Sequence, residues 1–357
     1  MKKYLLQMIV LCAAFCALLC VTVSAAYSGT CGDNLTWTLN DGNGTLIISG
    51  TGAMDNCANN LGNSTAPWSG LRSKIKTVVI KDGVTTIGDM AFYDCTSLTS
   101  VTIGNSVTTI GDAVFSGCRN LEDITIPNSV TTIGSAFSNC AFLTSVTIGN
   151  SVSAIGEWAF GYCYRLTSVT IPDSVTTIGN SAFYDCRSLT DITIPDSVTT
   201  IENNAFAECY SLTSVTIGNS VTTIGDRVFN HCPNVFLWVY RNSYAYTYAE
   251  ENNIPFDVLR VAYFGEFGNS MAYFLYNNGR LLIRGTGAMD NWENYDDVPW
   301  YAQRETIKTV TIENGAATIG NYAFYECKNL KSITIPDNIT FVGSYAFYSC
   351  SGPLSTT

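Results

Sequence analysis

One histidine, a recurring cysteine and scattered carboxylates are the residues of this chain that could do covalent chemistry. His231 stands next to Cys232, and the pair could be written as a nucleophile with its base. Cys232, however, belongs to a regular cysteine series, and the side chains of adjacent residues in an extended chain point to opposite faces. A single histidine also largely excludes a Ser-His-Asp triad and histidine-rich metal sites. We therefore predict no catalytic residues, no metal and no cofactor.

Carboxylates such as Asp94, Asp185 and Glu208 are the remaining candidates for chemistry, because a pair of carboxylates can hydrolyse a glycosidic bond. Such a pair needs a cleft, whereas a surface row of acids usually serves only solvation. A glycan-active enzyme is therefore a distant alternative, and the sequence favours a protein that is not an enzyme.

Aromatic and basic residues concentrate around the recurring cysteines, and they point to binding. Tyrosine and arginine combine a large contact area with directed hydrogen bonds, so they are enriched in interface hot spots. Tyr164, Arg187 and Tyr210 each follow their cysteine directly, so stacked repeats would place them in one column. The alternative is that these long side chains only cover a ridge. The candidate ligand-binding residues are Tyr162, Tyr164, Arg165, Tyr184, Arg187 and Tyr210.

The cysteines also predict the architecture. They recur at intervals of 23 residues, with a single interval of 22, and the same period of 23 residues is found again near the C-terminus. A fixed period in this range is typical of a solenoid, whose repeats bury their apolar side only against one another. The positions are Cys95, Cys118, Cys140, Cys163, Cys186, Cys209, Cys232, Cys327 and Cys350.

Alternation within one repeat predicts which side chains form the core. Leu98, Val101 and Ile103 should point inward, and Thr102 outward, on a strand that stacks in parallel on its neighbours. The recurring cysteines are expected to be buried free thiols, although coils about 5 Å apart would also permit disulfides between neighbours. Gly111 and its equivalents are expected to supply a backbone angle that other residues resist.

The repeat unit L-x-x-V-T-I-[GP]-x-S-V-T-T-I-G-x-x-A-F-x-x-C resembles the leucine-rich repeats of the BspA-like family of secreted and surface proteins. The block G-T-G-A-M-D, which begins at Gly50 and again at Gly285, also resembles part of that family. The resemblance implies a repeat solenoid of the leucine-rich type, a β-rich right-handed coil with parallel strands, short helical turns and β-type caps. It also implies adhesion to proteins or surfaces, without naming a ligand.

The repeated G-T-G-A-M-D block divides the chain into two modules. The second array of repeats has no closing segment, so either the chain is a fragment or a partner stabilises its last coil. The expected divisions are a signal peptide (1–25), an N-terminal β cap (26–74), seven leucine-rich repeats (75–234), a closing cap (235–261), a second β cap (262–306), two further repeats (307–350) and a tail (351–357).

Composition and charge restrict the compartment and the partners. Residues 1–25 combine Lys2 and Lys3 with an apolar stretch and small residues at its end, as in a secretory signal peptide; an uncleaved anchor is the alternative. Removing them takes the formal net charge from −11 to −13, which would repel a nucleic-acid backbone. No later segment is apolar enough to span a bilayer. The chain is therefore expected to be secreted or held at the cell surface, without membrane insertion after cleavage.

Cys31 and Cys57 stand outside the repeats, in the first cap. The corresponding block of the second module lacks both, since Trp292 aligns with Cys57, and Glu266 or Phe267 aligns with Cys31. Their joint absence suggests a disulfide between them, against the alternative of two independent free thiols.

Two functional classes fit these features. The first, which we favour, is recognition or adhesion of an extracellular protein or glycan through an extended repeat surface. The second is a structural spacer or coat component, in which uniform coils only hold other domains apart. A spacer should tolerate replacement of Tyr164, Arg187 and Tyr210 together, whereas a recognition protein should not.

Overall fold

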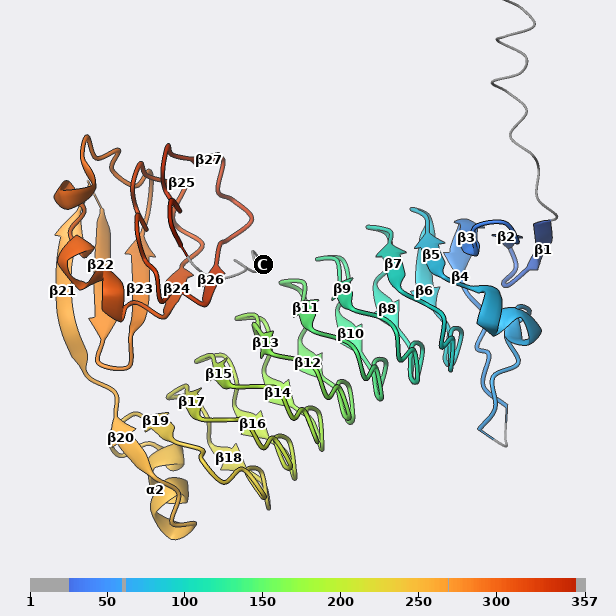
Figure 1. Cartoon of the computed structure of the whole chain (residues 1–357), viewed down its shortest axis with the longest axis horizontal. Helices are drawn as coiled ribbons and strands as arrows, with labels where there is room; N and C mark the ends of the chain where they lie inside the picture. Colours follow the sequence, from blue (N-terminus) through green and yellow to red (C-terminus); the bar gives the residue numbers. More distant parts are fainter. Residues whose placement is uncertain (1–25, 60–61, 269, 351–357) are drawn as a thin grey trace, which may run out of the picture.

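The computed structural model describes residues 26–59, 62–268 and 270–350. The predicted signal peptide and the tail at 351–357 lie outside the described residues. Within these ranges the chain forms two stacks of short parallel strands, each opened by an antiparallel meander (Figure 1). This confirms the predicted repeat solenoid. No helix in the described ranges is long and apolar enough to cross a membrane.

The first module opens with an antiparallel meander that passes directly into the repeats. Its third strand pairs antiparallel with the second and parallel with the first strand of the repeats, so the cap covers the apolar end of the first coil. The elements of the cap are β1 (Ala26–Thr30), β2 (Leu35–Asn40), β3 (Thr45–Gly50), β4 (Gly52–Ala53) and the 3-10 helix η1 (Ser69–Lys74).

Each repeat then contributes one strand to each of two sides of the coil. One series is β5 (Thr77–Ile80), β7 (Ser100–Ile103), β9 (Asp123–Thr125), β11 (Ser145–Thr147), β13 (Ser168–Val169), β15 (Asp191–Ile194) and β17 (Ser214–Ile217). The other series, which forms a single sheet with β4, is β6 (Val84–Ile87), β8 (Thr109–Ile110), β10 (Thr132–Ile133), β12 (Ala154–Ile155), β14 (Thr177–Ile178), β16 (Thr200–Ile201) and β18 (Thr223–Ile224).

A short closing segment follows, and then the second module repeats the pattern of the first. The closing segment consists of β19 (Leu237–Val239), the helix α2 (Tyr244–Glu251) and β20 (Phe256–Val258). The second module consists of the meander β21 (Val261–Phe267), β22 (Met271–Tyr276) and β23 (Arg280–Gly285), the 3-10 helices η2 (Tyr295–Asp297) and η3 (Tyr301–Thr306), and the parallel strands β24 (Thr309–Ile312), β25 (Thr318–Ile319), β26 (Ser332–Thr334) and β27 (Phe341–Val342).

A column of aromatic rings forms the centre of the first stack. One ring from each coil stacks on the next, as in Phe92 on Phe115, whose centroids lie 5.3 Å apart with an interplanar angle of 7°. The column begins at Trp68, which stacks on Phe92 at 5.4 Å and donates its indole N–H to the carbonyl of Ala91. It ends at Phe229, where Tyr248 of α2 makes an edge contact. The further members are Phe137, Phe160, Phe183 and Phe206.

The recurring cysteines are free thiols, and all of them except half-buried Cys350 are buried as predicted; they also do more than fill space. The thiol of Cys163 donates to the carbonyl oxygen of Phe137 in the preceding coil, with an Sγ to O distance of 3.3 Å. The same contact recurs from Cys186 to Phe160 at 3.3 Å. The sequence analysis treated the cysteine as a small apolar filler, but its weak S–H donor also satisfies a buried carbonyl.

The prediction for Gly111 is wrong. Its φ is not in the left-handed region; instead a Cβ there would lie 2.3 Å from Oδ1 of Asp89 in the preceding coil. The left-handed backbone falls on other residues, one of them directly before the cysteine, as at Tyr162 (φ 62°) and Asp185 (φ 58°). Glycine at this position therefore allows a close approach of coils and does not supply a backbone angle.

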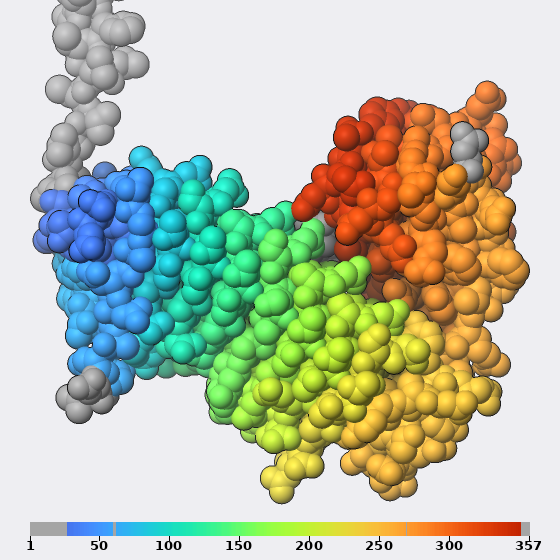
Figure 2. All heavy atoms as spheres, turned by 180° about the vertical axis from the view of Figure 1, so that it is seen from behind, coloured from blue at the N-terminus to red at the C-terminus, as the bar shows by residue number. Residues whose placement is uncertain are grey.

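The second module folds back over the strand face of the first, an arrangement that no sequence pattern indicated (Figures 1 and 2). Lys331 Nζ lies 2.8 Å from Oδ2 of Asp191, and Asn278 donates to the hydroxyl of Thr216 at 3.0 Å. The outward threonine column is exposed at Thr102, but Thr216 at its far end is buried. A few polar contacts thus fix one stack against the other.

The ladder thiols should resist alkylation while the protein is folded. Burial raises the pKa of Cys95 and of Cys163 to about 12, so at pH 9 few of these groups are thiolates, the form that reacts. With iodoacetamide at pH 9 and peptide mass mapping, we expect both to label only after unfolding in urea, whereas half-buried Cys350 labels first. Fast labelling of Cys163 in the folded protein would contradict a closed core.

Candidate functional site

A ridge of aromatic and charged side chains runs along the turns that flank the cysteines of the first stack. We call it the central ridge, and it consists of Trp158, Tyr162, Tyr164, Tyr184, Asp185, Arg187, Glu208, Tyr210 and His231. It contains five of the six predicted ligand-binding residues.

The backbone of the ridge is held in the left-handed region coil after coil. Tyr162, Asp185, Glu208 and His231 all have a φ between 57° and 62°. This conformation is uncommon for residues other than glycine. It persists here because the backbone N–H groups are paired with the next coil, as from Tyr162 to the carbonyl of Tyr184 at 2.7 Å and from Asp185 to that of Ala207 at 2.8 Å. The turns are therefore rigid supports for the side chains.

Four aromatic side chains pack together at the middle of the ridge. Trp158 stacks on Tyr162 at a centroid distance of 5.6 Å, and both meet Tyr184 edge-on, at 5.3 and 5.4 Å. Tyr164 joins them with an edge contact to Tyr162 at 6.2 Å. Tyr162 and Tyr184 were predicted, but Trp158 was missed, although a large aromatic residue at a variable repeat position is a usable signal.

Arg187 links the aromatic cluster to a buried carboxylate. Its guanidinium forms a bidentate pair with Asp185, with N to O distances of 2.7 and 2.9 Å, and lies 4.7 Å from the ring centroid of Tyr164. Asp185 is only 6% exposed, and its hydrogen bonds raise the pKa of Arg187. Tyr164 and Arg187 thus stack on consecutive coils, as their spacing predicted.

The next coil of the ridge is organised around Glu208. Its carboxylate accepts a hydrogen bond from the phenol of Tyr210 and lies 2.6 Å from Nδ1 of His231. The hydrogen bonds from Tyr210 and then His231 lower the pKa of Glu208. Cys232 points the other way and donates to the carbonyl of Phe206. His231 and Cys232 therefore do not meet, in agreement with the interpretation that they form no catalytic dyad.

Arg165 lies apart from the other predicted residues. Its guanidinium sits 4.0 Å from the ring centroid of Phe142 on the preceding coil, a cation–π contact that the sequence analysis did not foresee. Among the described residues, no group of three or more histidine, cysteine, aspartate or glutamate side chains could hold a metal ion. The arrangement is suited to contact with a partner through rings and charges.

Cys31 and Cys57 are both buried free thiols in the structure, so the disulfide hypothesised between them is not formed there. Burial is the main cause that raises the pKa of Cys31, and electrostatic repulsion from Cys57 raises it further. Both cysteines contact Asp55, whose N–H donates to the carbonyl of Cys31 and whose carbonyl accepts from the thiol of Cys57, and the disulfide stays a prediction. Peptide mapping of non-reduced protein, after air oxidation, should show a Cys31–Cys57 cross-link; two unlinked thiols would contradict it.

Comparison with known proteins places this architecture in a family. A model of the BspA-type leucine-rich repeat region matches in six copies over residues 71–163, 135–243 and 300–356. The chain belongs to the BspA-type leucine-rich repeat proteins. This confirms the resemblance seen in its repeat motif.

The BspA-type chain is also similar to solved structures. It is 28% identical to a leucine-rich repeat protein of T. pallidum, over 56% of this chain and 86% of that chain, with a TM-score of 0.44. It is 24% identical to a leucine-rich cell surface protein of Faecalibacterium prausnitzii A2-165, over 93% and 95% of the two chains, with a TM-score of 0.38. No curated protein matches it.

Asp185 should be replaceable by asparagine but not by alanine. Asparagine tolerates the left-handed φ of 58° and removes only the charge of a pair whose arginine is largely exposed, so the loss of stability should be small. Alanine adds the strain of that conformation, about 1 to 2 kcal/mol. Urea unfolding monitored by circular dichroism measures both variants. Equal losses would show that the backbone there is not strained.

Proposed function

We propose that this BspA-type protein acts outside the cell as a recognition or adhesion protein, and that it binds an extracellular protein or glycan through the central ridge. The observation that carries the proposal is the column of Tyr164 and Arg187, held in place by buried Asp185. Preorganised aromatic and guanidinium groups lose little conformational freedom on binding, which is how hot spots gain affinity.

Exposure supports the same conclusion. The side chain of Arg187 is 56% exposed and Tyr210 is 47% exposed, although both already have partners within the chain. Groups that are fixed yet open to solvent can contact a ligand without first being ordered. The proposed location, secreted or at the cell surface, is supported by the signal peptide predicted for residues 1–25.

The competing function is a structural spacer. It is favoured by the uniformity of the coils. A threonine hydroxyl in one coil donates to the carbonyl of the equivalent residue in the preceding coil, as from Thr131 to Thr108. A spacer, however, needs no aromatic cluster on one part of its ridge. The two functions therefore differ in whether the ridge side chains matter.

Binding of residues 27–357 to immobilised fibronectin, mucin and microbial glycans tests the proposal. The triple variant Tyr164→Ala, Arg187→Ala and Tyr210→Ala should lose at least tenfold in affinity, because hot-spot residues each contribute more than about 1 kcal/mol. The binding signal is measured by biolayer interferometry across a concentration series.

A matched triple variant serves as the control. Tyr27→Ala, Tyr93→Ala and Arg119→Ala remove two aromatic residues and one arginine from the cap and the earlier coils of the same module. This variant should bind as the unmodified protein does. Equal loss in both triples would argue against a localised site, and saturable binding to none of the probes would favour the spacer.

A further inference from the structure

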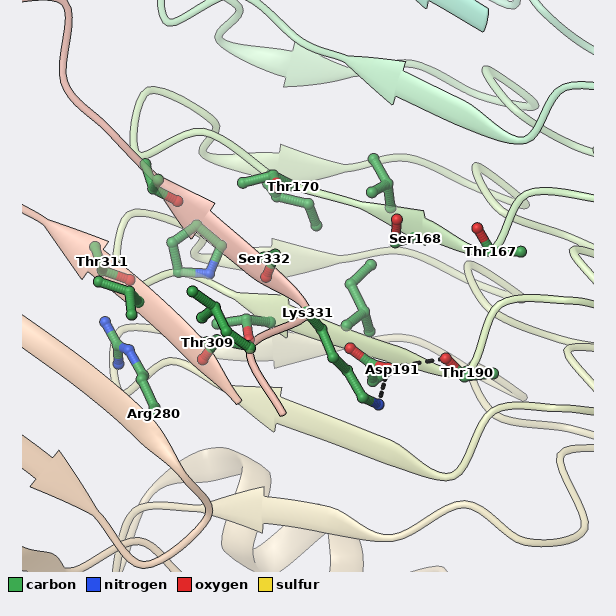
Figure 3. A pocket seen from close by; sticks show the side chains of 18 of the residues that line it. Thr167, Ser168, Thr170, Thr190, Asp191, Arg280, Thr309, Thr311, Lys331 and Ser332 are labelled. Carbon is green, nitrogen blue, oxygen red and sulfur yellow. Dashed lines mark hydrogen bonds and ion pairs between the residues drawn. The ribbon is translucent and has the colours of Figure 1, made fainter. Parts of the chain in front are cut away.

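A cleft opens where the second stack lies against the first. Its volume is about 390 Å³, within the range of small-molecule sites. One wall consists of β13, β15 and the residues that continue them, and the opposite wall of β23, β24, β26 and the turn before β26 (Figure 3). The cleft is thus a product of the duplication, since each wall comes from a different module.

The cleft coincides with a break in the first stack. Strands β9, β11 and β13 form one sheet, and β15, β17, β19 and β20 form another, so β13 and β15 are adjacent in the repeat order but are not paired. The second module spans this region: Lys331 meets Asp191 at 2.8 Å, and Asp337 accepts from Asn128 at 2.6 Å. These contacts hold the walls apart at a fixed separation.

Side chains that carry hydroxyl groups line both walls. Thr170 lies on one wall, and Thr309, Thr311 and Ser332 lie on the other (Figure 3). Thr193 also lines the cleft, and all five residues are half-buried. A hydroxyl can both donate and accept, as can the hydroxyls of a sugar.

The apolar lining residues are turned away from the cleft. The side chains of Val169, Ile192 and Val310 are at most 9% exposed, because they belong to the two cores. Peptide recognition by strands uses pockets for alternate side chains, and these walls offer no such apolar pockets. No aromatic side chain lines the cleft, so a neutral sugar has no ring to stack on.

A cation with spare hydrogen-bonding capacity stands at one end of the cleft. The Nε of Arg280 is buried and has no hydrogen-bond partner, and Arg280 takes part in none of the ion pairs found among the described residues. Lys328 adds a second exposed cation, while Lys331 is neutralised by Asp191. A buried unsatisfied donor is costly, and a turn of the Arg280 side chain toward the cleft would pair its guanidinium with a ligand acceptor.

We propose that this cleft binds a short oligosaccharide of uronic acid units, with Arg280 as the carboxylate ligand and the threonine hydroxyls of both walls as partners of the sugar hydroxyls. The planar guanidinium suits a carboxylate. Asp173 also lines the cleft, and its negative charge would repel the carboxylate of the ligand. This site is separate from the central ridge and does not depend on the function proposed for it.

Calorimetric titration of residues 27–357 with trigalacturonate tests the site. We expect saturable binding whose affinity falls about 10- to 100-fold in Arg280→Gln. The affinity should fall less in Arg280→Lys, which keeps the positive charge but cannot form a bidentate pair with a carboxylate. Arg119→Gln, the same change at an exposed arginine outside the cleft, should leave binding unchanged. No binding by the unmodified protein, or equal loss in Arg119→Gln, would overturn the proposal.

A second variant guards against a change in module packing. Thr170→Val with Thr193→Val removes two hydroxyls but keeps the β-branched shape of the strand, and it should weaken trigalacturonate at least fivefold. Unchanged affinity in that variant would overturn the proposal.

Alternative ligands and the ridge variant complete the test. Neutral galactotriose should bind at least tenfold more weakly than trigalacturonate, and a hexaglutamate peptide should not compete with it. Equal binding of either would overturn the assignment to acidic sugars. The variant with Tyr164→Ala, Arg187→Ala and Tyr210→Ala should retain trigalacturonate binding. The test of the cleft can therefore fail or succeed independently of the function proposed for the central ridge.

Discussion

The in-phase pairing of successive coils is the constraint on which the rest of the structure depends. Strand β10 pairs with β8 and β12 with identical positions opposite one another, Ile133 beside Ile110 and Ile155. Because one coil cannot bury its apolar side alone, every ring contact and every buried thiol exists only while this register holds. A slip by one residue would turn the core face of a strand to solvent, so the period is tightly constrained.

The single interval of 22 residues shows where the constraint relaxes. The coil that ends at Cys140 lacks one residue, yet β10 within it keeps its pairing on both sides. The other coils of this stack have a left-handed residue five positions before the cysteine, such as Trp158, and this coil has none there. The deletion is therefore absorbed in a turn, where no ladder bond is lost. Turns can vary, and this is why the ridge carries different side chains on each coil.

Much of the fold could be predicted from the sequence because its signals are periodic. The burial of Leu98 and Ile103, the thiol ladder and the column of Tyr164 and Arg187 all follow from repeat spacing and alternation. The role of Gly111 could not, because close approach and a special φ both select glycine. Phe142 was missed because its partner, Arg165, lies on another coil, and pairing between variable positions has no period.

The position of the second module was unpredictable for a different reason. It depends on isolated polar contacts, such as Asn278 to Thr216 and Lys331 to Asp191, that do not follow the period of the repeats. The regular stack nevertheless offers a surface on which the second module can dock, because the outward threonines present an even row of hydroxyls to any group that can donate or accept a hydrogen bond. The two faces do not interdigitate, since apolar side chains such as Val169 and Val310 are buried in the core of their own module. Polar walls that meet at few points thus enclose a cleft, whereas apolar faces would have closed on each other.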